Sequence, residues 1–352
     1  MRQKAMNLLG FDIGGTKCAV ILGRVCNPSD PTIPTASPEI LDRQSFSTRD
    51  ADSPDQAVRN MIELSQDMVG RLPGDEQPAG AGISCGSPLD SRRGLILSPP
   101  NLPGWDRVPV TDMISSAMKI PVWLLNDADA GALAEWQFGA GRGSSSMAFI
   151  TFGTGFGSGL ILNGRLYSGI DDGAGEIGHI RISPNGPVGY GKSGSLEGFC
   201  SGGGIAQLAR TRVMEKTQMG ERSAFCEAAG GPEYLTAKVV GEAAAGGDLL
   251  ARQILAESGE YLGRGLAILL DLLNLERIII GSIFVRSYDW IWPAADVTLR
   301  QESLNRNYLR CQVLRAELGE SIGDLAAISI ALEGLKGGLT SAVSAELKGA
   351  CP

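Results

Sequence analysis

Two stretches of this chain share one pattern, an apolar run, a glycine-rich turn and a second apolar run. The first is LLGFDIGGTKCAVILG at residues 8–23, and the second is MAFITFGTGFGSGLILNG at residues 147–164. Apolar runs on both sides of a glycine turn predict the two strands of a hairpin. Because this element recurs once early and once in mid-chain, we infer an internal duplication of an α/β unit that begins with a hairpin.

The first turn carries more chemistry than a turn needs, because it combines Asp12, Gly14, Gly15 and Thr16. Backbone N–H groups that point one way in a turn form a cradle for an anion. Glycine lets the backbone approach an oxyanion closely and adopt a positive φ without strain. The Thr16 hydroxyl can add a hydrogen bond, and Asp12 can hold a water bound to Mg²⁺. A GG pair between strands is most often only a turn, but its repetition favours a pair of phosphate-binding turns.

Neither of two common phosphate loops explains this turn. The sequence contains no GxxxxGK[ST] loop. A dinucleotide fingerprint requires a helix after its glycines, whereas a strand-like run follows here.

The rest of the chain alternates predicted strands and helices, as is typical of an α/β protein. Further strands are predicted over 40–46, 79–85, 121–125, 277–281 and 310–315. Helices are predicted over 54–71, where Ser53 is the expected cap and Pro54 the first residue, and over 108–120, 127–139, 246–274 and 321–336. The Pro/Ser/Thr-rich stretch 27–37 predicts a surface loop.

Composition argues against several functional classes. The net charge is −8 and no Lys/Arg run stands out, so a nucleic-acid partner is not expected. The most apolar stretch, residues 265–280, contains Asp271 and Glu276 and predicts a buried helix and a strand, not a membrane span. The apolar segment before Asp12 is too short for a signal peptide. Seven cysteines without a CxxC pair indicate reduced thiols. We therefore expect a cytoplasmic protein without a membrane partner.

Two segments offer candidate reactive groups. Asn126 and Asp127 lie where a buried strand becomes a helix, and functional groups of open α/β sheets collect at such carboxyl ends. The alternative role of Asp127 is that of a helix N-cap. The segment GAGEIGHIRI holds Glu176 and His179, the only histidine of the chain.

Two glycine-rich loops add further polar groups. The loop SPPNLPGW offers Asn101, and GSLEGFCSGG offers Glu197. Either one alone would be an ordinary loop or helix start. Asn, Asp, Glu and His side chains can each accept a hydrogen bond, so together they suit the several hydroxyls of one sugar.

Six motifs in this order resemble those of the ROK family, the sugar kinases and related repressors of the actin-like ATPase superfamily: FDIGGTK, PNLPGW, NDADAGALAE, FGTGFGSGLILNG, GEIGH and LEGFCSG. The resemblance implies an α/β, two-domain actin-like ATPase (ribonuclease H-like) fold with a central interdomain cleft for sugar and ATP. It implies a small N-terminal domain (1–125), a large C-terminal domain (126–320) and a last helix, about 321–337, that returns to the first. It also implies a homodimer.

The resemblance assigns the remaining roles. The catalytic base falls on Asp127, and the sugar contacts fall on Asn101, Asn126, Asp127, Glu176, His179 and Glu197. The phosphate turns fall on Gly14, Gly15, Thr16, Gly153, Thr154 and Gly155, the metal-side acid on Asp12, and an adenosine contact on Gly281. The implied reaction is ATP-dependent, Mg²⁺-assisted phosphorylation of a hexose hydroxyl.

Other readings stay open within this resemblance. The substrate could instead be an N-acetylhexosamine or fructose, or the protein could be a sugar-binding sensor without catalysis. A repressor would need a DNA-binding segment before the first hairpin, and only about seven residues precede it, so we do not expect one.

Two departures from the family pattern matter. Family members commonly bind a structural zinc through the GEIGH histidine and three cysteines, but Val188, Tyr190 and Ser195 stand at the cysteine positions here. Valine cannot ligate zinc and hydroxyls are poor substitutes for thiolates, so we predict no structural zinc. The late GG expected near the adenosine appears as Gly281–Ser282.

Overall fold

The computed structural model describes residues 4–27, 36–74 and 76–339. Most of the loop predicted over 27–37, and Cys351, lie outside the described residues. The chain forms two compact units. Unit 1 comprises Met1–Gly143, Gly159–Ala174 and Glu317–Pro352, and unit 2 comprises Ser144–Ser158 and Gly175–Ala316. The assignment of 1–125 and 126–320 to two domains stays a prediction.

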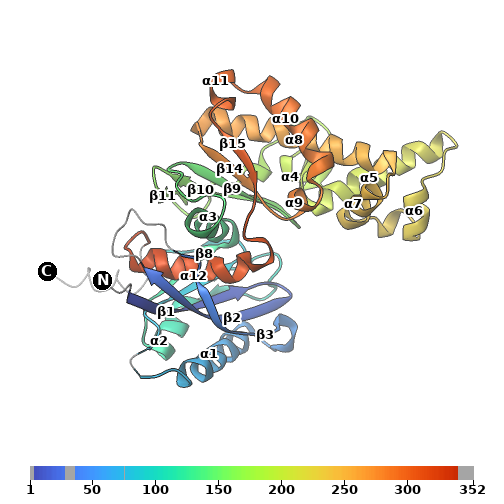
Figure 1. The fold of residues 1–352 in the computed structure, drawn as a ribbon. Helices are drawn as coiled ribbons and strands as arrows, with labels where there is room; N and C mark the ends of the chain where they lie inside the picture. The colour runs from blue at the N-terminus through green and yellow to red at the C-terminus, as the bar shows by residue number, and fades with distance from the viewer. Residues whose placement is uncertain (1–3, 28–35, 75, 340–352) are drawn as a thin grey trace. The chain divides into compact units, whose positions relative to one another are not determined.

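The first sheet has the strand order β3-β2-β1-β4-β8. Strands β1, β2, β3 and β8 of this sheet are labelled in Figure 1. Its strands are β1 (Lys4–Ile13), β2 (Lys17–Asn27), β3 (Glu39–Ser47), β4 (Ala81–Cys85) and β8 (Val122–Asn126). The β1–β2 pair is antiparallel, which confirms the first predicted hairpin, whereas β1, β4 and β8 are parallel. Their carboxyl ends therefore meet at one edge, where Ile13, Cys85 and Asn126 lie in register.

The second sheet repeats this arrangement with the order β11-β10-β9-β14-β15. Its strands are β9 (Met147–Phe152), β10 (Phe156–Leu162), β11 (Arg165–Leu166), β14 (Arg277–Ile280) and β15 (Gln312–Arg315). Strand β14 is parallel to both β9 and β15. In each sheet an antiparallel strand pair is followed by two parallel strands, which supports the inferred duplication.

The helices of unit 1 pack on the first sheet. Helix α1 (Pro54–Gly70) begins at Ser53, whose Oγ accepts a hydrogen bond from the Gln56 N–H, as predicted. Helix α12 (Ile322–Leu335) packs against α3 (Asp127–Phe138) and strands β1 and β4. A Cβ at Gly82 would lie 2.2 Å from the Ala327 carbonyl oxygen. Glycine at this position therefore lets α12 approach the sheet closely.

A small three-stranded sheet was not predicted from the sequence. Its strands are β5 (Leu89–Asp90), β6 (Leu95–Leu97) and β7 (Asp106–Val108). Because β7 ends at Val108 and Pro109 follows, the helix predicted from residue 108 begins later, as α2 (Val110–Met118).

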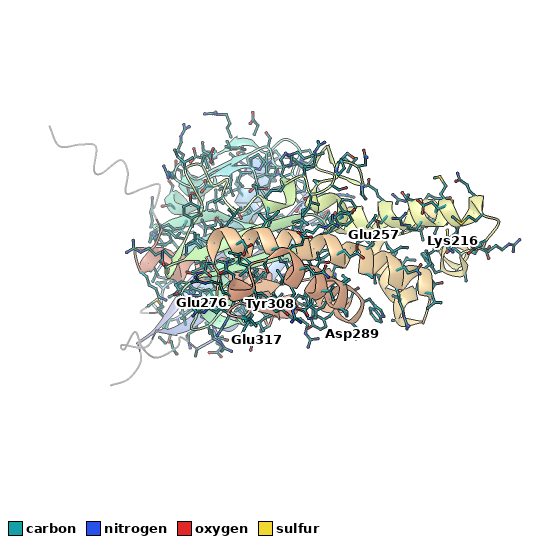
Figure 2. All side chains as sticks on the ribbon, turned by 90° about the horizontal axis from the view of Figure 1, so that it is seen from above. Lys216, Glu257, Glu276, Asp289, Tyr308 and Glu317 are labelled. Carbon is teal, nitrogen blue, oxygen red and sulfur yellow. The ribbon has the colours of Figure 1, made fainter. Side chains whose placement is uncertain are left out.

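Unit 2 carries most of the helices. They are α4 (Leu196–Phe199), α5 (Gly202–Gln218), α6 (Ala224–Ala229), α7 (Ala237–Ala245), α8 (Leu249–Leu273), α9 (Ile283–Arg286), α10 (Tyr288–Glu302) and α11 (Asn305–Tyr308). Helix α8 packs along α10 and α7. Its residue Glu257, labelled in Figure 2, forms an ion pair with Arg212 of α5 at 2.7 Å. Among the described residues, no helix is long and apolar enough to cross a membrane.

Candidate functional site

One group of predicted site residues gathers at the carboxyl edge of the first sheet, in unit 1. Asp12 is the penultimate residue of β1, and the turn at residues 14–16 follows directly. Asn126 ends β8, and Asp127 begins α3. Because β1, β4 and β8 are parallel neighbours, the structure brings these groups to one edge.

The Asn101 loop reaches the same edge. A Cβ at Gly15 would lie 2.2 Å from the Asn101 carbonyl oxygen, and one at Gly86 would lie 3.2 Å from Asn101 Oδ1. The loop is thus packed against the first turn and the end of β4. Close approach of Asn101 requires glycine at position 15. Neither Gly14 nor Gly15 adopts a positive φ, so close approach and not backbone conformation accounts for glycine here.

The first turn is braced by a residue that the sequence prediction missed. The Gly14 N–H donates to the Lys17 carbonyl oxygen at 3.0 Å. Thr48, just after β3, donates from its N–H to the Thr16 carbonyl oxygen (3.0 Å) and from its Oγ1 to the Gly14 carbonyl oxygen (2.6 Å). These bonds fix the backbone of the turn, while the Thr16 side chain is exposed.

Asn126, and not Asp127, is the N-cap of α3. Its Oδ1 accepts a hydrogen bond from the Asp129 N–H at 2.8 Å. The Asp127 side chain is exposed to solvent. Its pKa lies above the ordinary value because the surrounding protein desolvates the carboxylate, although the backbone N–H groups of Ala128 and of Asp127 itself oppose this rise. Asp127 is therefore free of the capping role and accessible.

Asp12 lies in a negative environment. Burial raises its pKa to about 6. The charges of Asp324 and Asp127 add to this rise, and those of Arg43 and Lys17 oppose it. Asp324 lies in the first turn of α12 and accepts two hydrogen bonds from Arg43 Nε, at 2.9 and 2.8 Å. Oxygen donors of this kind suit Mg²⁺ or a water bound to it. The role of Asp324 was not visible in the sequence.

A second carboxylate of α3 lies behind this edge. Asp129 is 1% exposed, and its Oδ2 accepts a hydrogen bond from Ser168 Oγ at 2.5 Å. Its Oδ1 is buried without a hydrogen-bond partner. Burial raises the pKa of Asp129 to about 7, and the charge of Asp172 adds to the rise. Asp129 is therefore a buried acid that titrates near neutrality.

The second turn, residues 153–155, lies in unit 2 beside two other backbone elements. The Gly153 carbonyl oxygen accepts a hydrogen bond from the Gly202 N–H, the first residue of α5, at 2.8 Å. A Cβ at Gly153 would lie 3.6 Å from Ser282 Oγ. The second turn therefore lies close to Ser282, the residue after the predicted adenosine contact Gly281. The start of α5 is hydrogen-bonded to the same turn.

Ser282 adopts a backbone conformation that favours glycine. Its φ is +57° and its ψ is −115°. Its Oγ accepts a hydrogen bond from Arg286 Nη2 at 3.2 Å. Serine therefore occupies, with strain, the conformation of the second glycine expected here.

Glu197 also belongs to the second turn. Its Oε2 accepts a hydrogen bond from the Phe156 N–H at 3.0 Å, next to Gly155. Helix α4, which carries Glu197, packs against the short helix η2 (Ile177–His179). Glu176 precedes this helix and His179 is its last residue, and both are exposed. The polar groups predicted in unit 2 thus come from neighbouring segments.

The residues near His179 do not fit a structural zinc. The expected thiolate positions hold Val188, Tyr190 and Ser195. Cys200 is fully buried and its thiol donates to the Ser258 carbonyl oxygen at 3.4 Å, while burial raises its pKa and disfavours the thiolate. Across residues 4–27, 36–74 and 76–339, no group of three or more His, Cys, Asp or Glu is arranged to hold a metal ion.

Comparison with known proteins identifies the family. The profile of the ROK family matches residues 8–333. The chain belongs to the ROK family. Its fold is the α/β actin-like fold of that family. Glucokinase from Halalkalibacterium halodurans is 33% identical over 78% of this chain and 79% of that protein. Glucokinase from Thermotoga maritima is 30% identical over 94% of this chain and 99% of that protein.

Solved structures agree and also show the breadth of the family. A ROK glucokinase from Streptomyces griseus, in complex with glucose and AMPPNP, superposes with a TM-score of 0.69 at 27% identity, over 93% of this chain and 100% of that one. A ROK transcriptional regulator, a homologue of the Escherichia coli MLC protein, superposes with a TM-score of 0.80 at 23% identity, over 95% of this chain and 80% of that one. The latter likeness shows the fold alone.

Proposed function

We propose that this ROK protein is a sugar kinase that transfers the γ-phosphoryl group of ATP to a hydroxyl of a glucose-like hexose. The observation that carries this proposal is the arrangement at the start of α3. Asn126 caps the helix, and the Asp127 carboxylate remains accessible with a raised pKa. A carboxylate that is accessible and does not cap the helix is available to accept the proton of a substrate hydroxyl.

Asp127 acts as the general base in this proposal. Its carboxylate takes the proton of the sugar hydroxyl while the hydroxyl oxygen forms a bond to the γ-phosphorus. The bond between that phosphorus and the bridging oxygen breaks, and ADP leaves with the bond's electron pair. Phosphoryl transfer depends mainly on positioning and on stabilisation of charge. Asn101 and Asn126, at the same sheet edge, are proposed to bind sugar hydroxyls, as are Glu176, His179 and Glu197.

The two turns are proposed to bind phosphates through those backbone N–H groups that take part in no bond within the turn, which excludes those of Gly14 and Gly153. The brace from Thr48 holds the first turn in a fixed shape before a ligand arrives, and preorganised donors stabilise a developing charge most effectively. Asp12 would hold Mg²⁺ through a bound water, and Mg²⁺ when bound would neutralise charge on the phosphoryl oxygens. A cation near Asp12 would also favour its ionised form.

The identity of the sugar is a separate question. The glucokinase relatives favour glucose. The bifunctional enzyme NanE/NanK of Brucella melitensis is 29% identical over 92% of this chain and 54% of that protein. An N-acetylhexosamine is the second candidate and fructose the third, as the motif resemblance leaves both open. A sugar-binding sensor without catalysis is the alternative class, because the positions expected to hold zinc ligands and the second glycine of the late GG are both altered in this chain.

A coupled assay of ADP release against a panel of hexoses and N-acetylhexosamines tests this function. We expect turnover with at least one sugar. Asp127→Asn should lose about 10²–10⁴-fold in kcat while it still binds sugar in calorimetry, because the amide keeps the shape but accepts no proton. Asp112→Asn, an exposed first-turn aspartate of α2, is the matched control. Sugar binding without turnover would establish the sensor, and near-normal turnover of Asp127→Asn would remove Asp127 from its role.

A further inference from the structure

The segment from residue 180 to residue 200 is closed on itself by backbone hydrogen bonds. The Gly194 carbonyl oxygen accepts bonds from Ile182 and Ser183, and the Leu196 N–H donates to the Ile180 carbonyl oxygen. Within it, β12 (Val188–Gly189) and β13 (Lys192–Ser193) form a small antiparallel hairpin. The segment connects η2, which carries His179, to α4, which carries Glu197. Its shape therefore decides where both side chains lie.

Ser195 joins the hairpin to α4 from a fully buried position. Its Oγ accepts a hydrogen bond from the Gly198 N–H at 3.1 Å, which makes it the N-cap of α4. The same hydroxyl donates to the Gly189 carbonyl oxygen at 3.4 Å. A Cβ at Gly189 would lie 2.5 Å from the Gly198 nitrogen, so the two backbones are in direct contact.

Gln207 holds the other side of the hairpin. It lies on α5, and its side-chain amide binds both backbone groups of one residue. Its Oε1 accepts from the Val188 N–H at 2.9 Å, and its Nε2 donates to the Val188 carbonyl oxygen at 2.9 Å. A side-chain amide has an acceptor and donors side by side. The Gln207 amide therefore bonds to the edge of β12 as a neighbouring strand would. Each unmade bond of this kind would leave a backbone group without its partner.

Lys192 of β13 ties the hairpin to η2, because its Nζ donates a hydrogen bond to the His179 carbonyl oxygen at 2.7 Å. Tyr190, in contrast, is 71% exposed and contacts the His179 ring only edge-on, with the ring centroids 6.1 Å apart. The hydrogen bonds of Ser195, Gln207 and Lys192, more than packing of Tyr190, hold this segment.

We propose that Ser195 and Gln207 form a metal-free clamp that positions Glu197 and His179 for sugar binding. The clamp involves two of the three positions where the family resemblance leads one to expect zinc ligands: the Val188 backbone is bound by Gln207, and the Ser195 hydroxyl is committed to two bonds. The clamp fixes the first turn of α4, and the Glu197 carboxylate then reaches the Phe156 N–H. The functional part of this proposal rests on the kinase activity proposed above.

A graded set of variants at Gln207 tests the clamp. Gln207→Ala removes both bonds, and Gln207→Glu keeps the acceptor but loses the donor. Gln218→Ala, an exposed glutamine at the end of the same helix, is the matched control. Gln207 is only partly buried, so these variants should fold. We expect faster hydrogen–deuterium exchange in peptides covering residues 180–200 for Gln207→Ala, an intermediate rate for Gln207→Glu and no change for the control.

Kinetics test the positioning role. Gln207→Ala should raise the KM for sugar by about tenfold and leave the KM for ATP within about twofold, a split that general loss of stability would not produce. Equal changes in the KM for sugar and the KM for ATP, or an unchanged KM for sugar, would overturn the positioning role of Gln207. If no sugar is phosphorylated at all, the kinase function fails, whereas the exchange measurement still decides whether the clamp exists.

Metal analysis tests the remaining part. Protein purified without chelators should contain far less than one zinc per chain, and a chelator should leave its melting temperature and the exchange of residues 180–200 unchanged. One bound zinc whose removal lowers the melting temperature would overturn the metal-free clamp.

Discussion

The side-chain oxygen of Asn126 lies 2.8 Å from the backbone nitrogen of Asp129 and caps helix α3. Asn126→Ala should therefore destabilise the protein by about 1 kcal/mol, whereas Asn126→Asp keeps a capping oxygen and should stay near wild type. Urea unfolding of both variants measures the difference. A stability of Asn126→Ala equal to that of wild type would show that the cap contributes nothing.

The titration of Asp129 gives a pH prediction with a definite sign. Its pKa is raised from the usual 3.8 to about 7 because it is buried, so the folded state binds this proton more tightly than the unfolded state. This contribution to stability is fully present below pH 3.8 and is lost as pH rises toward 7. The full shift corresponds to at most about 4 kcal/mol.

Asp129→Asn should remove this pH dependence. The variant should be more stable than wild type at pH 8, and its advantage should shrink as pH falls toward 5. Asp12 titrates in the same direction, with a pKa of about 6, so only the difference between variant and wild type is informative. Parallel stability curves for the two proteins across this range would contradict the assignment.

Ser282→Gly should stabilise the protein by about 1–2 kcal/mol, because glycine adopts the positive φ of this position without strain. The hydrogen bond from Arg286 would be lost and offsets part of this gain. Ser303→Gly, at a φ of −104°, is the control and should lose stability. A lower melting temperature of Ser282→Gly would mean that the hydroxyl contributes more than the strain takes away.

Gly15→Ala should raise the KM for sugar as well as that for ATP. A Cβ at this position would lie 2.2 Å from the Asn101 carbonyl oxygen, so the Asn101 loop and the first turn must move apart. Gly70→Ala, where a Cβ meets nothing within 4 Å, is the control for kinetics. An effect confined to ATP would mean that the loop tolerates the shift and only the phosphate turn is disturbed.

The sequence predicted those parts of the molecule that depend on local pattern. Apolar runs around glycine turns gave both hairpins, and the sequence around Asp127 correctly gave a strand followed by a helix. The strands of β5, β6 and β7 were missed because two or three residues are too few to show a period of two.

Long-range contacts set the limit of that prediction. Thr48 braces a turn more than thirty residues earlier in the chain, and Asp324 approaches Asp12 only after α12 has packed on the sheet. No local pattern marks either residue. The function of Gly15 was likewise hidden, because a sequence does not tell whether a glycine supplies a positive φ or room for a neighbour.

The matching strand orders of the two sheets have an evolutionary consequence. Strand β8 of the first sheet occupies the same place as β15 of the second. Strand β8 ends with Asn126 and is followed by Asp127, whereas β15 ends with Arg315, whose guanidinium lies 4.8 Å from the centre of the Tyr288 ring, and is followed by Ala316. If one ancestral half was copied, the copies have diverged at this strand end, where an aspartate follows β8 and an alanine follows β15. The molecule is therefore redundant in framework but not in chemistry, and no spare carboxylate stands at the equivalent place to compensate for the loss of Asp127.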